Sequence, residues 1–485
     1  MDTHAAIVFL AGNRAYKVKR AVKLPYLDYS TLELRRVMCG REVEINTRTA
    51  PGLYRGVVAI TQGTDGRLAF NGEGPVIEWA IEMERFGQDC VLNRLADSGA
   101  LTLAHMARLA DHVAEFHAAA EARPTVDGAA AMAKVIGYTV PAFEAAGERL
   151  PEGHARRYRE MIYAAHEAQS PLLRRRATRG YVRHCHGDMH LRNIVLLEGE
   201  PTLFDAIEFD EELTNIDVLY DIAFLVMDLW HRGLKAHANH VVNVYLGHAG
   251  DPQDLAGLEA MPLFLSCRAA VRAMVGLDRL PHIAEADRPE AVREILRYFD
   301  LANRLLKPEP PRLVAIGGLS GTGKSTLGAA LAPQFGAVPG ALHLRSDVER
   351  KRLFGVAPTE RLGADAYRPT VNARVFHELN RRAKAALEAG HSVLVDAVFL
   401  RPEERTNIQA VADNLGVPFS GLWLSAPRDV LIERVTKRSG DASDADAAVV
   451  ELQLGRTTGP VSWTPVEAGG PAEKVAVAAA RELGL

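Results

Sequence analysis

The sequence predicts two domains of different class. The first is an α+β region with a small β-rich lobe and a large helical lobe, and the second is an α/β domain with a parallel sheet. Three observations support this: strand patterns recur before residue 86, Ala- and Leu-rich helical patterns dominate from residue 101, and strands alternate with helices after residue 312. A length of 485 residues also favours more than one hydrophobic core.

The predicted boundary is a proline-rich segment, Lys307-Pro308-Glu309-Pro310-Pro311. Its prolines cannot continue a helix and favour a stiff, extended spacer. A helical pattern from Ala291 to Leu306 precedes it, and an apolar strand follows it. We therefore expect a first domain at residues 1–306, a linker at 307–311 and a second domain at 312–485.

In the small lobe, apolar residues on both sides of the turn Gly12-Asn13 predict a hairpin of residues 7–10 and 15–19. A helix is expected within residues 31–50 and a further strand at residues 76–83. The larger lobe consists of long predicted helices, which a β-like stretch at residues 182–209 interrupts.

The second domain opens with the phosphate-loop pattern G-x-x-x-x-G-K-[ST] at residues 318–325. A buried strand precedes it and a helix follows it, which is the context that separates this motif from a chance Gly/Ser loop. Glycine amides close around phosphate oxygens, the Lys reaches the β- and γ-phosphates, and the Ser hydroxyl holds Mg²⁺. We expect ATP and Mg²⁺ at these residues: Gly318, Ser320, Gly321, Thr322, Gly323, Lys324, Ser325 and Thr326.

A second polar group, residues 186–193, has the sequence H-G-D-M-H-L-R-N. Kinases use an Asp to orient the acceptor hydroxyl, and an Asn five residues later with a further Asp to hold Mg²⁺. Asp188 and Asn193 have this spacing, and a predicted hairpin returns Asp205 to Asn193. The alternative is zinc bound by four neighbouring side chains: His184, Cys185, His186 and His190. Along a strand these side chains diverge, and no second Cys/His pair completes a tetrahedral site.

The H-G-D-x-H-x-x-N pattern, followed by an apolar strand and an Asp, resembles the aminoglycoside phosphotransferase and choline kinase family, which has a protein-kinase-like fold. The resemblance implies that Asp188 is the catalytic base and that Asn193 and Asp205 are Mg²⁺ ligands. It also implies supporting roles for three residues: His186, Glu208 and Asp221.

The resemblance further calls for a nucleotide-binding Lys on a small-lobe strand, paired with a Glu on the next helix. Lys17 in Ala15-Tyr16-Lys17 and Glu42 fit, with Lys19 and Glu44 as nearby alternatives. An exposed hairpin Lys and a helix-surface Glu remain the simpler interpretation. Residues 76–86 are the expected adenine-binding hinge. One departure from the family is that only about one strand precedes Lys17, with no Gly-rich loop.

Other residues of the second domain resemble the group of P-loop kinases that includes gluconate kinase, polynucleotide 5′-kinases and zeta-type toxins. A predicted strand ends at Ser346-Asp347, and basic residues follow on the next helix. The resemblance implies that Asp347 accepts the proton of the acceptor hydroxyl and that Arg350 binds substrate. The alternative for Asp347 is a helix N-cap.

The strand at residues 392–395 leads to Asp396, the position of a Walker-B carboxylate that organises Mg²⁺. A polar strand end is the alternative. Residues 438–445 resemble an arginine-bearing lid, in which Arg434 and Arg438 would stabilise charge on the transferred phosphoryl group. Taken singly, each arginine is equally explained as a surface charge.

Composition narrows the classes of partner. A net charge of −4 without a dense basic tract gives no electrostatic footprint for nucleic acid, so we expect none as a partner. Four scattered cysteines, the lack of an apolar run of membrane-span length and an N-terminus without signal-peptide features predict a cytoplasmic protein with no membrane partner. The sequence does not indicate the oligomeric state.

The pairing of domains resembles bacterial proteins in which an aminoglycoside-phosphotransferase-family domain is fused to a predicted P-loop kinase. We expect a Mg·ATP-dependent kinase with two nucleotide sites that phosphorylates a hydroxyl of a small metabolite, such as a sugar or amino sugar. Three alternatives are a pseudokinase-like N-terminal lobe that regulates the P-loop domain, a zeta-toxin-like domain held by that lobe, and a polynucleotide 5′-kinase.

Overall fold

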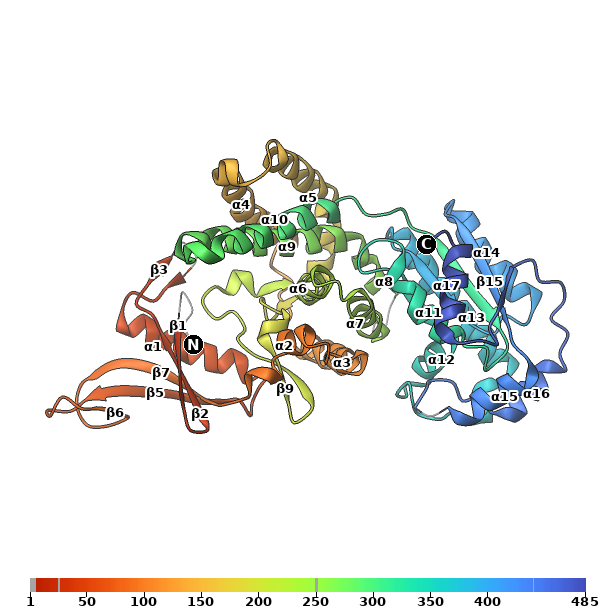
Figure 1. The fold of residues 1–485 in the computed structure, drawn as a ribbon, viewed down its shortest axis with the longest axis horizontal. Coiled ribbons are helices and arrows are strands. Elements are labelled where there is room, and N and C mark those ends of the chain that lie inside the picture. Colours follow the sequence, from red (N-terminus) through yellow and green to blue (C-terminus); the bar gives the residue numbers. More distant parts are fainter. Residues whose placement is uncertain (1–5, 25–26, 249–251, 439) are drawn as a thin grey trace. The chain divides into compact units, whose positions relative to one another are not determined.

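The structure is a computed structural model that describes residues 6–24, 27–248, 252–438 and 440–485 (Figure 1). Its residues group into two compact units, Met1–His231 with Leu263–Asn303, and Arg232–Pro262 with Arg304–Leu485. Residues 232–262 therefore group with the phosphate-loop region, which the sequence pattern does not reveal. The domain division at residues 307–311 stays a prediction.

The small lobe of the first unit is a five-stranded antiparallel sheet in the order β1-β2-β7-β5-β6, with helix α1 packed on it (Figure 1). Its elements are β1 (Ala6–Ala11), β2 (Arg14–Lys19), α1 (Leu32–Asn46), β5 (Tyr54–Gln62), β6 (Leu68–Phe70) and β7 (Val76–Glu84). A short ribbon of β3 (Lys23–Leu24) and β4 (Leu27–Asp28) precedes α1. The predicted hairpin forms because Gly12 adopts a φ of 59°, and α1 begins where the Thr31 side chain accepts the Leu34 amide.

The larger lobe is mainly helical. Its helices are α2 (Leu92–Asp97), α3 (Leu103–Ala119), α4 (Gly128–Ala146), α5 (His154–Thr178), α6 (Val218–His231), α9 (Met261–Arg279) and α10 (Arg288–Leu305). Two ribbons carry the β-like stretch: β8 (Val182–His184) with β11 (Asn215–Asp217), and β9 (Ile194–Leu197) with β10 (Glu200–Leu203). Helix α6 is buried from Val218 to Leu229 and forms the centre of this lobe.

The expectation that no apolar run reaches the length of a membrane span needs correction. The segment Ala256–His282 is long and apolar enough to cross a membrane by length and composition. Within the structure, 61% of its most apolar window is buried, which is typical of a core helix. Leu263, Phe264 and Leu265 of this segment are at most 2% exposed.

The second unit contains a five-stranded parallel sheet in the order β13-β14-β12-β15-β16. Its strands are β12 (Leu313–Gly318), β13 (Leu342–Arg345), β14 (Val393–Asp396), β15 (Phe419–Ser425) and β16 (Thr464–Glu467). Its helices are α7 (Lys235–Gly247), α8 (Pro252–Leu255), α11 (Lys324–Leu331), α12 (Ser346–Phe354), α13 (Pro369–Glu388), α14 (Pro402–Leu415), α15 (Arg428–Lys437), α16 (Ala447–Leu454) and α17 (Ala472–Glu482). Because the carboxyl ends of parallel strands meet at one edge, the segments after β12, β13 and β14 converge there.

Helix α7 explains why residues 232–262 group with this unit. The side-chain amides of Asn239 and Asn243 donate to the Ala341 carbonyl at 3.0 and 3.3 Å. The Asn243 side-chain oxygen accepts the backbone amide of His343 at 2.6 Å. Helix α7 thus satisfies backbone groups at β13, the edge strand of the sheet.

Candidate active sites

The phosphate loop turns tightly between β12 and α11. Gly318, Gly321 and Gly323 have φ values of 139°, 88° and 89°, which L residues with side chains rarely adopt. A Cβ atom at Gly321 would lie 2.7 Å from the Leu431 carbonyl oxygen. The glycines of the motif are therefore required by backbone conformation, and at Gly321 also by close packing.

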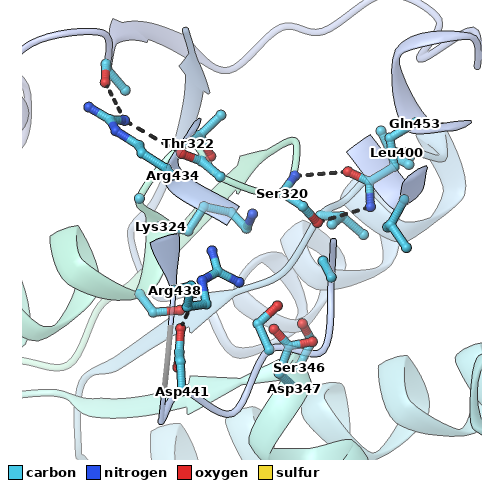
Figure 2. Close-up of a pocket in the computed structure, with 18 of the residues that line it drawn as sticks. Ser320, Thr322, Lys324, Ser346, Asp347, Leu400, Arg434, Arg438, Asp441 and Gln453 are labelled. Carbon is cyan, nitrogen blue, oxygen red and sulfur yellow. Dashed lines mark hydrogen bonds and ion pairs between the residues drawn. The ribbon is translucent and has the colours of Figure 1, made fainter. Parts of the chain in front are cut away.

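Lys324 lies at the first position of α11, and its side chain turns back over the loop. Its Nζ donates to the carbonyls of Gly318 and Leu319 at 2.9 and 3.0 Å, and burial lowers its pKa. Gln453 of α16 fastens the loop from outside, because it accepts the Ser320 amide at 2.8 Å and donates to the Ser320 hydroxyl at 3.1 Å (Figure 2). No sequence signal pointed to Gln453, since this contact joins segments 133 residues apart.

Asp396, at the end of β14, lies beside the phosphate loop. Its Oδ1 accepts the Ser325 hydroxyl at 3.3 Å, and its Oδ2 pairs with His343 Nε2 at 2.6 Å. Burial would raise the pKa of Asp396, but His343 and Arg345 hold it below its usual value. A hydroxyl and an ionised carboxylate are oxygen ligands that suit Mg²⁺, so this pair fits the metal expected from the motif.

Asp347 lies in the first turn of α12 and lines the same cleft (Figure 2). The N-cap interpretation is wrong, because Arg345 holds the cap position and no side chain caps the helix. Burial and the nearby Asp396 raise the pKa of Asp347. Arg350, one turn later, donates to the Ala366 carbonyl at 2.6 Å.

Two predicted arginines hold different positions around this cleft of about 1240 Å³. Arg438 lies 3.5 Å from Asp441, and its Nη1 is buried without a hydrogen-bond partner among the described residues (Figure 2). Arg434 instead donates to the carbonyls of Ala468 and Gly470 at 2.8 and 3.0 Å. Arg438 therefore has an N–H donor that a bound phosphate could use. Arg434 instead uses its donors to hold the backbone at Ala468 and Gly470.

The first unit gathers the predicted lysine and carboxylates of the small lobe. Lys17 Nζ lies 2.7 Å from Glu42 Oε1 and also contacts Asp205. Burial alone would lower the pKa of Lys17, but Asp205 and Glu42 raise it well above its usual value. Lys19 also pairs with Glu42, at 2.6 Å, and with Glu208, so the two lysines share one carboxylate. The simpler interpretation, in which Lys17 is an exposed hairpin residue and Glu42 lies on the helix surface, is therefore wrong, because the two side chains form an ion pair and Glu42 is fully buried.

The catalytic-loop motif is held by a buried carboxylate. Asp221 accepts the amides of His186 and Gly187 at 3.0 and 2.9 Å, and Asn193 donates to Asp188 Oδ2 at 2.7 Å. Burial would raise the pKa of Asp188, but charged neighbours, with His190 first, lower it below its usual value. An ionised Asp188 is the state that a general base requires.

Asp205 returns to Asn193 as the predicted hairpin requires. Strands β9 and β10 pair in register, and the Phe204 amide donates to the Asn193 carbonyl at 3.0 Å. Asp205 has a φ of 61°, and its amide donates to the Tyr54 hydroxyl at 3.1 Å. Asn193 and Asp205 offer oxygen ligands of the kind that Mg²⁺ prefers. No sequence signal pointed to the contact of Tyr54 with Asp205.

The structure reproduces the departure from the kinase family in the small lobe. Strands β1 and β2 are joined by the tight turn at Gly12-Asn13, and residues 6–11 are the one described strand before Lys17. The segment expected as a hinge is mostly strand β7, which ends at Glu84.

The alternative of a zinc site does not agree with the geometry. Within the described residues, the group of close potential metal ligands is His117, Cys185 and Asp221, which does not include His184, His186 or His190. Asp221 in this group is engaged by backbone amides.

Two family models match separate parts of the chain. Residues 87–264 match the model described as the phosphotransferase enzyme family, and residues 313–460 match that of an AAA domain. The chain joins a phosphotransferase-family domain to a P-loop domain. It is an ATP-dependent phosphotransferase with a kinase-like N-terminal region and an α/β P-loop region.

Curated relatives match the chain over almost its whole length. The chain is 28% identical over 481 residues to uncharacterized proteins of Mycobacterium tuberculosis and Mycobacterium bovis, covering 98% of this chain and 93% of theirs. Among solved structures, a gluconokinase from Sinorhizobium meliloti is 22% identical over 36% of this chain and 93% of its own, with a TM-score of 0.25. An ethanolamine kinase from Plasmodium vivax is 11% identical over 60% of this chain and 75% of its own, with a TM-score of 0.37.

Proposed function

We propose that this protein transfers the γ-phosphoryl group of Mg·ATP to a hydroxyl of a small metabolite, and that the transfer takes place in the P-loop cleft. The observation that carries the proposal is that Lys324 and Asp347 line one cleft and that Asp396 accepts the hydroxyl of Ser325, another residue of its lining. The three residues lie at or just after the ends of three neighbouring strands. Phosphoryl transfer depends mainly on positioning and on charge stabilisation, and this cleft supplies groups for both.

Each group has a distinct task in the proposed reaction. When bound, Mg·ATP would supply the phosphoryl group, and its Mg²⁺ would offset negative charge on the phosphates. Backbone amides of the loop and Lys324 would hold phosphate oxygens, and Ser325 with Asp396 would hold the metal. Asp347 accepts the proton of the acceptor hydroxyl, a task for which a raised pKa brings the carboxyl nearer to working pH. The free Nη1 of Arg438 is available for charge on the transferred group.

A second candidate function concerns the first unit. Its catalytic-loop residues are assembled, but the tight Gly12-Asn13 turn leaves no Gly-rich loop over the phosphates. This combination favours a lobe that binds a ligand and regulates the P-loop domain. Turnover by the full-length Lys324→Ala variant tests this function. Turnover that continues in this variant would contradict a purely regulatory lobe.

The test of the main proposal follows ADP release by the purified full-length protein with Mg·ATP and a panel of hydroxylated metabolites. We expect Asp347→Asn to lower kcat by about 10²- to 10⁴-fold, since general-base catalysis contributes that much, and to leave the KM for ATP unchanged. Asp413→Asn is the matched control, because Asp413 is an exposed carboxylate on α14. Full activity of Asp347→Asn would refute the proposed base, and phosphorylation of a 5′-hydroxyl oligonucleotide in place of small metabolites would refute the acceptor class.

A further inference from the structure

A groove between α13 and α14 continues from the P-loop cleft. The groove has a volume of about 420 Å³ and shares four lining residues with the cleft: Asn372, Phe376, Arg401 and Glu404. The cleft also contains Asp347, so a molecule whose hydroxyl meets Asp347 has room to extend into the groove. None of the residues predicted from motifs lies in the groove.

A strained turn shapes the wall that the cleft and the groove share. Phe399 has a φ of 47° although it is 1% exposed, a conformation that costs about 1–3 kcal/mol and persists only where packing enforces it. Its ring lies 5.5 Å from that of Phe376 and 5.0 Å from that of Trp463. The two residues after it, Leu400 and Arg401, line the cleft. Backbone strain of this kind concentrates at functional sites.

The side chains of the groove are suited to hydroxyl groups. Asn372, Asn380 and Asn407 contribute amides, each with both donors and an acceptor, and a hydroxyl group also donates and accepts. Asn380 and Asn407 have no side-chain hydrogen bond to another described residue, so their amides are available to a ligand. The partly exposed ring of Phe376 adds an apolar face between them.

The charged side chains of the groove carry more negative than positive charge. Arg401, Glu403 and Glu404 give its lining one positive and two negative charges, and His377 adds a titratable ring. Arg401 lines both the cleft and the groove, whereas Lys324 and Arg438 line the cleft alone. A phosphate, sulfate or carboxylate group on the far end of the acceptor would therefore meet net negative charge.

We propose that the groove between α13 and α14 binds the part of the acceptor remote from the reacting hydroxyl, and that this acceptor is a sugar or amino sugar without anionic groups. The inference rests on the proposed function, because it takes Asp347 as the point that the reacting hydroxyl reaches. It adds a substrate class and a second set of contacts, formed by Asn380, Asn407 and Phe376.

The test measures binding and turnover separately on the full-length protein. The probes are glucose, glucosamine, trehalose and kanamycin, against the anionic compounds glucose 6-phosphate and gluconate. Ligand-observed NMR gives the Kd and ADP release gives kcat and KM. We expect binding by at least one uncharged or cationic probe and weaker binding by the anionic ones. Asn380→Ala and Asn407→Ala should each raise Kd and KM about three- to tenfold, the effect of one lost hydrogen bond, with kcat retained.

Asn414→Ala is the matched control, since Asn414 is exposed on the same helix and lies outside the groove. The proposal is overturned if no probe binds, if the anionic compounds bind as well as their uncharged counterparts, or if both groove variants bind like the control. Groove-dependent binding without phosphorylation of any probe would support the groove and contradict the proposed function. Phosphorylation that depends on Lys324 but not on Asn380 or Asn407 would support the proposed function and contradict the role of the groove.

Discussion

The buried carboxylate of Asp221 gives a prediction whose size can be worked out from the structure. Asp221 is fully buried, accepts the amides of His186 and Gly187, and lies 3.2 Å from His117 Nε2. Asp221→Asn removes the negative charge and replaces one acceptor oxygen with a donor, so that two donors face each other. The loop that carries Asp188 should then open more easily.

The lowered pKa of Asp221 gives the size of the stabilisation that this carboxylate contributes. Burial would raise this pKa, but His117, His186 and Arg268 lower it from 3.8 to about 2. At about 1.36 kcal/mol per pH unit, the lowering corresponds to about 2–3 kcal/mol of stabilisation of the folded unit. Since the folded pKa lies below the unfolded value, this stabilisation is complete above about pH 4 and is lost as the pH falls toward 2.

Hydrogen exchange of the residue 186–193 segment, followed by mass spectrometry, measures the effect directly. At pH 7 we expect Asp221→Asn to speed exchange of the His186 and Gly187 amides by about 30- to 150-fold. Glu152→Gln is the control, because it makes the same change of charge at an exposed position of the same unit. Exchange in Asp221→Asn that matched the control would refute the reasoning.

Three further variants test other parts of the account. Gly321→Ala should weaken ATP binding in calorimetry at least about tenfold, because its Cβ would meet the Leu431 carbonyl at 2.7 Å in a left-handed backbone; unchanged affinity would contradict this. Arg438→Ala should lower kcat about 10²- to 10³-fold with little change in KM for ATP, as loss of a charge-stabilising donor does, and a change confined to KM would refute that role. Lys19→Met should lower the thermal midpoint of the first unit in calorimetry, because it leaves buried Glu208 without its cation; an unchanged midpoint would contradict the ion pair's structural role.

Local patterns were enough to predict several elements correctly. The turn at Gly12-Asn13, the strand before the phosphate loop and the hairpin that returns Asp205 all depend on residues close in sequence, and the structure contains each of them. The parallel sheet of the P-loop region also followed from the alternation of strands and helices.

Features that depend on long-range contacts could not be predicted in this way. Gln453 meets the phosphate loop and Tyr54 meets Asp205 across more than a hundred residues. The grouping of residues 232–262 with the P-loop region depends on amides of Asn239 and Asn243, which look like ordinary helix residues in the sequence. Periodicity reports which face of an element is apolar, but not which distant element covers it.

The most direct test of the central claim compares Lys324→Ala with Asp188→Asn in acceptor-dependent ATP consumption. The two variants remove one predicted catalytic group from each unit, so each reports on one site. We expect Lys324→Ala to abolish phosphorylation of the acceptor and Asp188→Asn to retain it. Loss of activity in Asp188→Asn, with full activity in Lys324→Ala, would contradict the account and place the chemistry in the N-terminal unit.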